Sequence, residues 1–542
     1  MNYNNKSLLL IASGLLACSC QQTEPQRPNI ILIMADDLGF SDLGCTGAEI
    51  IKTPNIDYLA ENGIMFNQFY NASRCAPTRA SLLTGHYAHT VDMGWMTASD
   101  LGRRGYGGDM DTLAPTLAEV LRDNGYATYM TGKWHVTFDK FQTNDGPKHN
   151  WPTNRGFEKF FGQLSGGGGY FIPRSLTHQD QRIEAPEGFY LTNSINDYTV
   201  DYLEDHFQNR NDQPFFLYLA HYAPHFPLHA LEEDIDLYRG KFMIGWDRLR
   251  VKRYENQLAL GLIDEHWKLT PTPEGIPQWE SLADTTKMIW DAKMAVYAAQ
   301  MHRMDVGIGM MIETLRKHDQ LDNTLIIFIS DNGATMEPIG RQITLADVET
   351  LGDNSTYVSY REPWANVSNT PFKWYKSYSH QGGIVTPFIA HWPAGIPHKG
   401  KVLNQQGHVI DFMPTFLELA GASYPGFSYD GESIPLEGVS LIPAFEGQVF
   451  DRPPLFFEHE TNRAVIDGEW KLVAARYGWP WQIGDWELYN LRIDPTETNN
   501  LIDEFPQIAQ KLEQQWNHWA EENHVLPMDS KGWNEKIDAS VR

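Results

Sequence analysis

The stretch Asn29-Ile-Ile-Leu-Ile-Met-Ala-Asp-Asp37 decides the fold of this chain. Its apolar residues follow one another without interruption and end in two carboxylates. Such a run is typical of a strand that is buried on both faces of a parallel sheet. Parallel strands need crossover connections, which are usually helices. The stretch therefore predicts an α/β protein whose two aspartates lie at the end of a central strand.

The same unit recurs along the chain. Helix-like segments are expected at residues 116–124, 197–209 and 292–318, and strand-like runs at 127–131, 214–220, 324–330 and 386–391. Alternating helices and strands predict a doubly wound α/β sheet that is flanked by helices.

The pattern changes near residue 450. Short strands are expected at 455–458, 462–466, 470–475 and 486–490, with a hairpin signal at Asp467-Gly468, and an amphipathic helix at 507–522. We expect a large catalytic α/β domain at 29–449 and a smaller C-terminal subdomain at 450–542, made of an antiparallel sheet and a helix. A length of 542 residues agrees with two such units.

The N-terminus predicts export. Lys6 precedes an apolar run at 8–17 that is too short to span a bilayer and fits a secretory signal peptide, residues 1–17. The end of this run resembles a bacterial lipoprotein signal, which predicts a lipid anchor on Cys18, or less favourably Cys20, and a tether at 18–28. The expected location is the cell envelope, on the periplasmic side of the outer membrane. An ordinary cleaved leader or a misassigned start remains the alternative.

The net charge of the chain limits the classes of molecule that it can bind. The net charge is −26, from 43 basic and 69 acidic side chains, which argues against a nucleic acid partner. An anionic small substrate would need a local cluster of cations to overcome this field.

Four predicted strands end in polar residues. These are Asp36 and Asp37, Lys133 and His135, His221 and His225, and Asp331 and Asn332. Ligands of doubly wound sheets bind beyond the carboxyl ends of the strands. The four clusters therefore predict one polar site at that edge.

A further motif supplies a candidate nucleophile, Cys75-Ala-Pro-Thr-Arg-Ala-Ser-Leu-Leu-Thr-Gly85. Pro77 suits the first turn of a helix, so Cys75 is expected just before the helix N-terminus, where the helix dipole favours an anion. Arg79 lies one turn further on and can reach back toward residue 75. The alternative is a structural cysteine or a disulfide with Cys45.

The motif C-x-P-x-R-x-x-x-x-T-G resembles that of the type I sulfatases, in the alkaline phosphatase superfamily. The resemblance implies an alkaline phosphatase-like fold with a mixed sheet. It also implies that a maturation enzyme oxidises Cys75 to formylglycine. The family's calcium site falls on Asp36, Asp37, Asp331 and Asn332, with residue 75 completing it. All of these offer oxygen ligands, which suit Ca²⁺ or Mg²⁺ and not zinc.

The resemblance also assigns catalytic roles. Lys133 and Lys376 would hold the sulfate, and Arg79 would hold the hydrated aldehyde. One hydroxyl of the hydrate attacks sulfur in line and forms a sulfated enzyme. His225 is expected to protonate the leaving alcohol. The second hydroxyl then loses its proton to His135, and the bond to sulfate breaks as the aldehyde re-forms.

Some positions near the motifs are less clear. Lys373 lies three residues before Lys376, and only the spacing to the paired glycines at 382–383 favours the latter. Gln381 stands where many sulfatases have Glu, so a local ion pair is expected to be absent. Gly166–Gly169 is expected to be a flexible loop near the pocket, and His221 a packed histidine outside the catalytic set.

The leading hypothesis is a sulfuric ester hydrolase that acts on a sulfated carbohydrate such as a mucin O-glycan or a glycosaminoglycan. The alternatives are a general arylsulfatase, a phosphonate or phosphate diester hydrolase of the same superfamily, and a glycan-binding protein without turnover. Residues that could line the substrate pocket are Trp95, Arg103, Arg104, Arg174 and His178.

Overall fold

The computed structural model describes residues 27–429, 431–478, 482–526 and 528. The predicted signal peptide, both candidate lipid-bearing cysteines and all but the last two residues of the tether lie outside this part. Among the described helices, none combines the length and the apolar character that a membrane crossing requires.

The centre of the fold is one ten-stranded mixed sheet with the order β10-β2-β9-β8-β1-β7-β3-β4-β5-β6. Its strands are β1 (Asn29–Ala35), β2 (Ile64–Tyr70), β3 (Ala127–Lys133), β4 (Lys159–Gln163), β5 (Leu176–His178), β6 (Gln181–Arg182), β7 (Phe215–Ala220), β8 (Thr324–Ser330), β9 (Val385–His391) and β10 (Lys401–His408). Strands β8, β1, β7, β3 and β4 are parallel neighbours. Strand β9 runs antiparallel to β2 and β8, and β5 and β6 close the other edge antiparallel.

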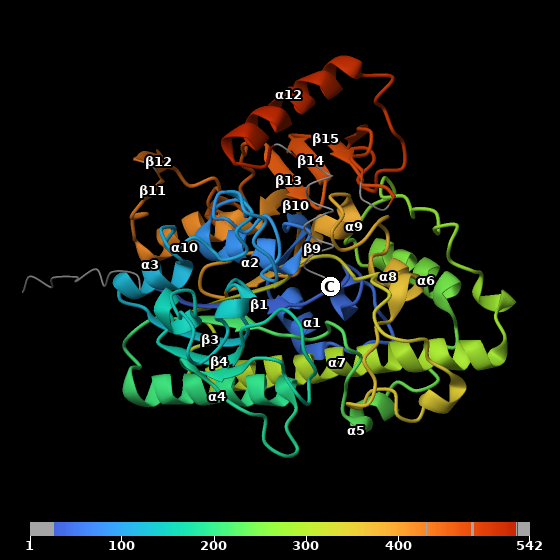
Figure 1. Cartoon of the computed structure of the whole chain (residues 1–542), viewed down its shortest axis with the longest axis horizontal. Coiled ribbons are helices and arrows are strands. Elements are labelled where there is room, and N and C mark those ends of the chain that lie inside the picture. Colours follow the sequence, from blue (N-terminus) through green and yellow to red (C-terminus); the bar gives the residue numbers. More distant parts are fainter. Residues whose placement is uncertain (1–26, 430, 479–481, 527, 529–542) are drawn as a thin grey trace, which may run out of the picture.

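Strand β1 is buried along its whole length, as its apolar run predicts. Ile31 and Ile33 face one core, together with helices on one side of the sheet, while Ile30 and Leu32 face a second core on the other side. The first side carries α1 (Pro54–Glu61), α4 (Leu191–Asn209), α5 (Glu232–Asp236), α6 (Trp246–Ala259), α7 (Asp284–Lys317) and α8 (Arg361–Ser368). The second side carries α2 (Cys75–Thr84), α3 (Leu117–Asp123), α10 (Phe412–Ala420) and α11 (Ile442–Phe445). Figure 1 shows α4 and α7 along the lower side of the sheet, with α2, α3 and α10 opposite them.

A second, four-stranded antiparallel sheet follows in the chain. It consists of β13 (Leu455–His459), β14 (Asn462–Asp467), β15 (Trp470–Ala474) and β16 (Glu487–Asn490), and α12 (Pro506–Glu522) lies across it (Figure 1). Its apolar side chains belong to the same continuous core as those of β1 and α7. The described residues also form the short helix α9 (Gln381–Ile384), the hairpin of β11 (Phe427–Tyr429) and β12 (Glu432–Ile434), and several 3₁₀ turns.

The mixed α/β fold with a small C-terminal antiparallel sheet is confirmed, and the predicted strands coincide closely with β1, β3, β7, β8 and β9. Strands β2 and β10 were not expected, because polar residues interrupt both: Asn67 and Gln68 in the first, Asn404 to Gln406 in the second. Helices α4 and α7 begin earlier than expected, at Leu191 and Asp284. The division of the chain near residue 450 stays a prediction.

Candidate active site

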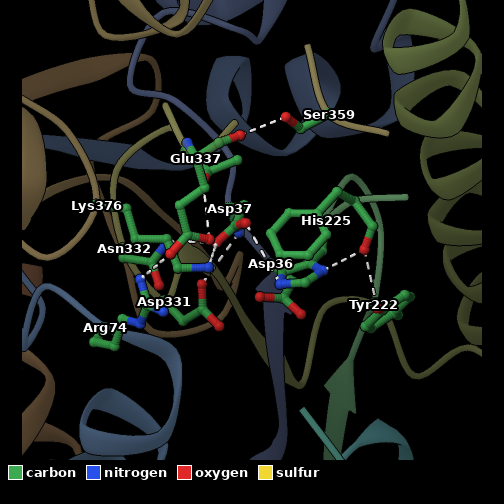
Figure 2. A network of polar contacts seen from close by, with 12 residues as sticks. Asp36, Asp37, Arg74, Tyr222, His225, Asp331, Asn332, Glu337, Ser359 and Lys376 are labelled. Atoms are coloured by element: carbon green, nitrogen blue, oxygen red, sulfur yellow. Dashed lines mark hydrogen bonds and ion pairs between the residues drawn. The ribbon is translucent and has the colours of Figure 1, made fainter. Parts of the chain in front are cut away.

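The aspartates at the end of β1 meet the polar residues at the end of β8. The two strands are parallel neighbours with Ala35 opposite Ser330, so Asp36, Asp37, Asp331 and Asn332 leave the sheet at one point (Figure 2). The backbone N–H of Asp37, which adopts a left-handed conformation with φ 65°, donates to Asp331 Oδ1 at 3.2 Å. Asn332 donates from Nδ2 to Asp37 Oδ1 at 2.7 Å.

Helix α2 brings Cys75 to the same point. The helix begins at Cys75 itself, one residue earlier than the proline in its first turn suggested, and ends at Gly85 with φ 75°. The Cys75 sulfur and carboxylate oxygens of Asp36 and Asp331 lie within 4.8 Å of one another. Thr78, inside the motif, donates to the Asp331 carbonyl at 2.7 Å and so fastens the helix to the end of β8.

Cys75 is buried and forms no disulfide. The described part of the chain contains two free thiols, Cys45 and Cys75, so the alternative of a disulfide between them is wrong. Burial raises the pKa of the Cys75 thiol, although Lys133 and Lys376 oppose this shift. A protonated thiol is a poor nucleophile. The unmodified side chain is therefore not an activated cysteine.

Three buried cations surround the carboxylates. Lys133 Nζ lies 2.5 Å from Asp36 Oδ2, Lys376 Nζ lies 2.6 Å from Asp37 Oδ1, and the Arg79 guanidinium lies 2.7 Å from Asp331 Oδ2. Each of these cations is at most 4% exposed. This is the local positive cluster that an anionic substrate requires in a chain of strongly negative net charge.

Two histidines complete the cluster. Nδ1 of His225 donates to the carbonyl of the next residue, Phe226, at 2.5 Å. The other ring nitrogen, Nε2, therefore faces Asp37 Oδ2 at a distance of 3.6 Å. Burial, followed by the charge of Lys133, lowers the pKa of both His225 and His135 well below the usual range. Both rings are therefore neutral at pH 7 in the free protein.

The donor atoms fit a hard divalent cation. Asp36 Oδ1, Asp37 Oδ2 and Asn332 Oδ1 are buried and have no hydrogen-bond partner. Burial and the neighbouring Asp331 raise the pKa of Asp36 well above its usual range, a shift that a bound cation would oppose. Oxygen donors of this kind suit Ca²⁺ or Mg²⁺. The four residues that the resemblance assigns to calcium therefore lie together, and three of them carry a buried oxygen without a partner.

The structure separates the less certain candidates. Lys373 donates to the Tyr489 hydroxyl at 2.9 Å and has no contact with the carboxylate cluster, whereas Lys376 lies within it. His221 is buried with neither ring nitrogen bonded, and burial lowers its pKa to about 3. Of the two lysines, only Lys376 contacts the carboxylates, and the catalytic role of Lys376 stays a prediction.

Gln381 contacts a buried ion pair that two other residues form. Its side-chain oxygen accepts from Lys471 Nζ at 3.2 Å, and Lys471 also forms a buried ion pair with Glu497 at 2.6 Å. Gln381 itself accepts a hydrogen bond as a neutral amide, and the carboxylate partner of Lys471 is Glu497, from a distant segment of the chain.

The candidate pocket residues are dispersed. Trp95 stacks on His459 with ring centroids 5.5 Å apart, and both rings are buried. His178 packs against Tyr198 and Phe161, on the first side of the sheet. Arg103 and Arg104 line a surface pocket together with acidic residues, and Arg174 lies beside the glycine run at 166–169. Sequence reasoning missed Arg74, which directly precedes Cys75 and donates to Glu337 and Ser377.

The family model described as Sulfatase matches residues 28–422. The chain belongs to the sulfatase family. A second model, N-sulphoglucosamine sulphohydrolase, C-terminal, matches residues 371–522. This sulfatase is a sulfuric ester hydrolase, as the motif at Cys75 implies.

Relatives cover nearly all of this sulfatase. An uncharacterized sulfatase of Schizosaccharomyces pombe is 33% identical over 551 residues, which is 93% of this chain and 96% of the relative. The arylsulfatase of Klebsiella aerogenes is 33% identical over 463 residues, 81% of this chain and 96% of the relative. The N-acetylgalactosamine-6-sulfatase of Canis lupus familiaris is 27% identical and covers 90% and 77% of the two chains.

Solved structures share the fold. The crystal structure of Ps i-CgsB in complex with k-i-k-neocarrahexaose is 26% identical, has a TM-score of 0.67, and covers 95% of this chain and 98% of that one. The architecture described above is therefore that of the sulfatase and alkaline phosphatase-like proteins.

Proposed function

We propose that this sulfatase removes sulfate from a sulfated carbohydrate, with formylglycine formed from Cys75 as nucleophile and Ca²⁺ as cofactor. The observation that carries the proposal is the convergence of three buried cations and three orphaned oxygens around residue 75. A sulfate ester needs both features, because its negative oxygens must be neutralised before a nucleophile can reach sulfur.

The cation would be held by Asp36, Asp37, Asp331 and Asn332, and would neutralise and orient a sulfate oxygen when bound. Lys133 and Lys376 are each bonded to a different carboxylate of this cluster, Asp36 and Asp37 respectively. In this proposal their ammonium groups would bind the remaining sulfate oxygens. Because both are buried, their charges act on the substrate with little screening by water.

Residue 75 would act as an aldehyde hydrate, which supplies one hydroxyl for attack and a second for release of sulfate. Arg79 reaches back from the second turn of α2 to Asp331 and the Lys133 carbonyl, and so fixes the helix end that presents residue 75. The helix N-terminus there favours developing negative charge on the nucleophile.

The two neutral histidines handle protons. His225 presents Nε2 toward the cluster, and the negative charge of a bound sulfate would favour its protonation, as a general acid for the leaving alcohol requires. His135, neutral because it is buried among cations, is available as a base for the release step. Its Nδ1 has no partner in the protein.

Support for a carbohydrate substrate comes from the relatives. One is named for N-acetylgalactosamine 6-sulfate and one structure contains a neocarrahexaose. The Klebsiella arylsulfatase keeps a general aryl sulfate as the second candidate. We also retain the proposal of an exported, lipid-anchored enzyme, which the apolar run at 8–17 and Cys18 support; labelling with a radioactive fatty acid, lost in Cys18→Ala, would test it.

The test is release of inorganic sulfate from a panel of sulfated sugars and 4-nitrophenyl sulfate, with a phosphate diester for comparison. We expect the highest kcat/KM on a sulfated sugar, and loss of turnover in Cys75→Ala. Hydrolysis of the aryl ester alone would favour a general arylsulfatase. Faster hydrolysis of the phosphate diester would contradict the proposal.

A further inference from the structure

The glycine run Gly166–Gly169 begins beside His135, one of the two histidines of the site. It follows β4, the neighbour of β3, and the register places Gln163 directly beside Lys133. Residues that pair across parallel strands point to the same face, and neighbouring strands lie about 4.8 Å apart. Gln163 therefore stands one strand spacing from a lysine that is placed to bind sulfate.

The run packs against His135 and is held in place. A Cβ at Gly166 would lie 2.0 Å from His135 Nε2, so only glycine fits beneath this ring. Ser165 donates to the Gly167 carbonyl at 2.8 Å, and Tyr222 donates to the Gly168 carbonyl at 3.0 Å. These bonds tie the run to the site, in contrast to the flexible loop that the four glycines suggested.

Gln163 is buried without any bond for its amide. The side chain is 1% exposed, and neither Oε1 nor Nε2 has a hydrogen-bond partner in the protein. A Cβ at Gly168 would lie 3.4 Å from Oε1, which places the amide against the glycine run. Buried polar groups are rarely left unpaired, because each lost bond costs about 1–3 kcal/mol. The amide thus offers the two N–H donors of Nε2 and the acceptor Oε1 to a group that is not part of the chain.

His229 offers a second unpaired group on the same run. Its Nε2 bonds the Thr356 carbonyl, which can only accept, so Nε2 carries the proton and Nδ1 is a bare acceptor. That Nδ1 has no partner, and it lies 3.5 Å from a Cβ placed at Gly169. Burial lowers the pKa of His229, which agrees with a neutral ring.

The surroundings suit a sugar. Nothing lies within 4 Å of a Cβ placed at Gly167, so the middle of the run borders open space. Tyr357, next to Thr356, is 48% exposed and lies within electrostatic reach of Arg174 and Tyr222. An exposed ring can cover the apolar face of a sugar, while unpaired amide and imidazole atoms bind its hydroxyl groups.

We propose that Gln163 and His229, beside Gly168 and Gly169 of the glycine run, bind hydroxyl groups of the sugar that carries the sulfate. This inference rests on the proposed function. The amide of Gln163 can donate to one sugar hydroxyl and accept from a second, and Nδ1 of His229 can accept from a third. The two residues would therefore determine which substrates the enzyme prefers. An aryl sulfate lacks these hydroxyls and gains nothing from either residue.

The experiment compares kcat/KM on two kinds of substrate in enzyme whose residue 75 has been verified as matured. The sugars are galactose 6-sulfate, N-acetylgalactosamine 6-sulfate and carrageenan oligosaccharides, and the aryl ester is 4-nitrophenyl sulfate. Gln163→Leu removes the amide. His229→Gln keeps a donor for the Thr356 carbonyl while withdrawing the Nδ1 acceptor. We expect the ratio of sugar to aryl kcat/KM to fall roughly tenfold to hundredfold in each variant.

The matched control is Gln257→Leu, which removes a buried amide that already donates to the Thr46 and Thr370 carbonyls. It should lower stability and leave the ratio unchanged. If Gln163→Leu does not fold, Gln163→Asn, which withdraws the amide by one carbon, should lower the same ratio.

The outcomes are distinguishable. An unchanged ratio in the Gln163 and His229 variants, with sugar turnover by the wild type, would overturn the recognition site alone and leave the sulfated-sugar function standing. Equal losses on both substrates would show that the amide holds structural water or supports the fold, and would overturn it as well. Wild-type turnover of 4-nitrophenyl sulfate but of no sugar would overturn the carbohydrate function, and the recognition site with it.

Discussion

Replacing Arg79 by methionine tests how the charges of the site balance one another. Arg79 is fully buried, donates to Asp331 Oδ2 at 2.7 Å and to the Lys133 carbonyl at 2.9 Å, and lies 3.8 Å from Asp36. Methionine fills much of the same volume and carries no charge. The substitution therefore leaves the negative charges of Asp36 and Asp331, both fully buried, with less compensation.

The expected loss of stability follows from the burial of the ion pair between Arg79 and Asp331. Removing one partner of a buried ion pair costs about 3–5 kcal/mol, because the remaining charge is uncompensated. A bound divalent cation acts on the same carboxylates as Arg79 does. We therefore expect the loss for Arg79→Met to be larger in a chelator than in saturating Ca²⁺.

The assay is urea unfolding, monitored by circular dichroism, with and without Ca²⁺. The free energies of unfolding are compared only if the fitted m-value is the same for the variant and the wild type. The control is Arg341→Met, which removes a solvent-exposed ion pair with Asp347 and should leave the unfolding midpoint unchanged. A loss as small as that of the control would refute the buried charge network. A loss that does not depend on Ca²⁺ would refute the placement of the cation at these carboxylates.

Three further predictions follow from single side chains. Cys75→Ala should fold normally and lose sulfate release by at least about a thousandfold, measured by ion chromatography; retained turnover would exclude residue 75 as nucleophile. Lys471→Met should destabilise the protein by about 3–5 kcal/mol, measured by thermal unfolding, because Glu497 stays buried without its cation. The double variant Lys471→Met and Glu497→Gln should recover much of this stability, and no recovery would contradict the pairing. The folded-state pKa of His221, about 3, lies below its ordinary value of 6.5, so the unfolded chain binds the extra proton and stability is lost as pH falls below about 6.5. His221→Phe should therefore spare about 2 kcal/mol of the stability lost between pH 7 and 5, and an unchanged pH dependence would show that the ring is protonated or exposed.

The central strands can be predicted from the sequence because strands that are buried on both faces consist almost entirely of apolar residues. Strands β1, β7 and β8 are apolar except at their end residues, and they are buried along their whole length between two helical layers. Edge strand β10, by contrast, is half exposed and carries Asn and Gln, so no alternation or apolar run marks it. Its place in the sheet depends on pairing with β2, which is more than three hundred residues earlier in the chain.

The site divides in the same way. Asp36, Asp331 and Lys133 follow recognisable strands, so their meeting at one edge can be predicted from topology. Lys376 lies in no regular element, and only the family resemblance singled it out. The roles of Gln163 and His229 have no sequence signal at all, because an unpaired amide becomes visible only when every neighbouring atom has been placed.

Mass spectrometry of the peptide that contains residue 75, from protein made in a host with the maturation enzyme, is the most direct test of the chemistry proposed for this sulfatase. We predict that the thiol of Cys75 has been exchanged for an aldehyde oxygen, and that the fraction converted matches the fraction of active enzyme. An unmodified cysteine in fully active protein would contradict the formylglycine mechanism.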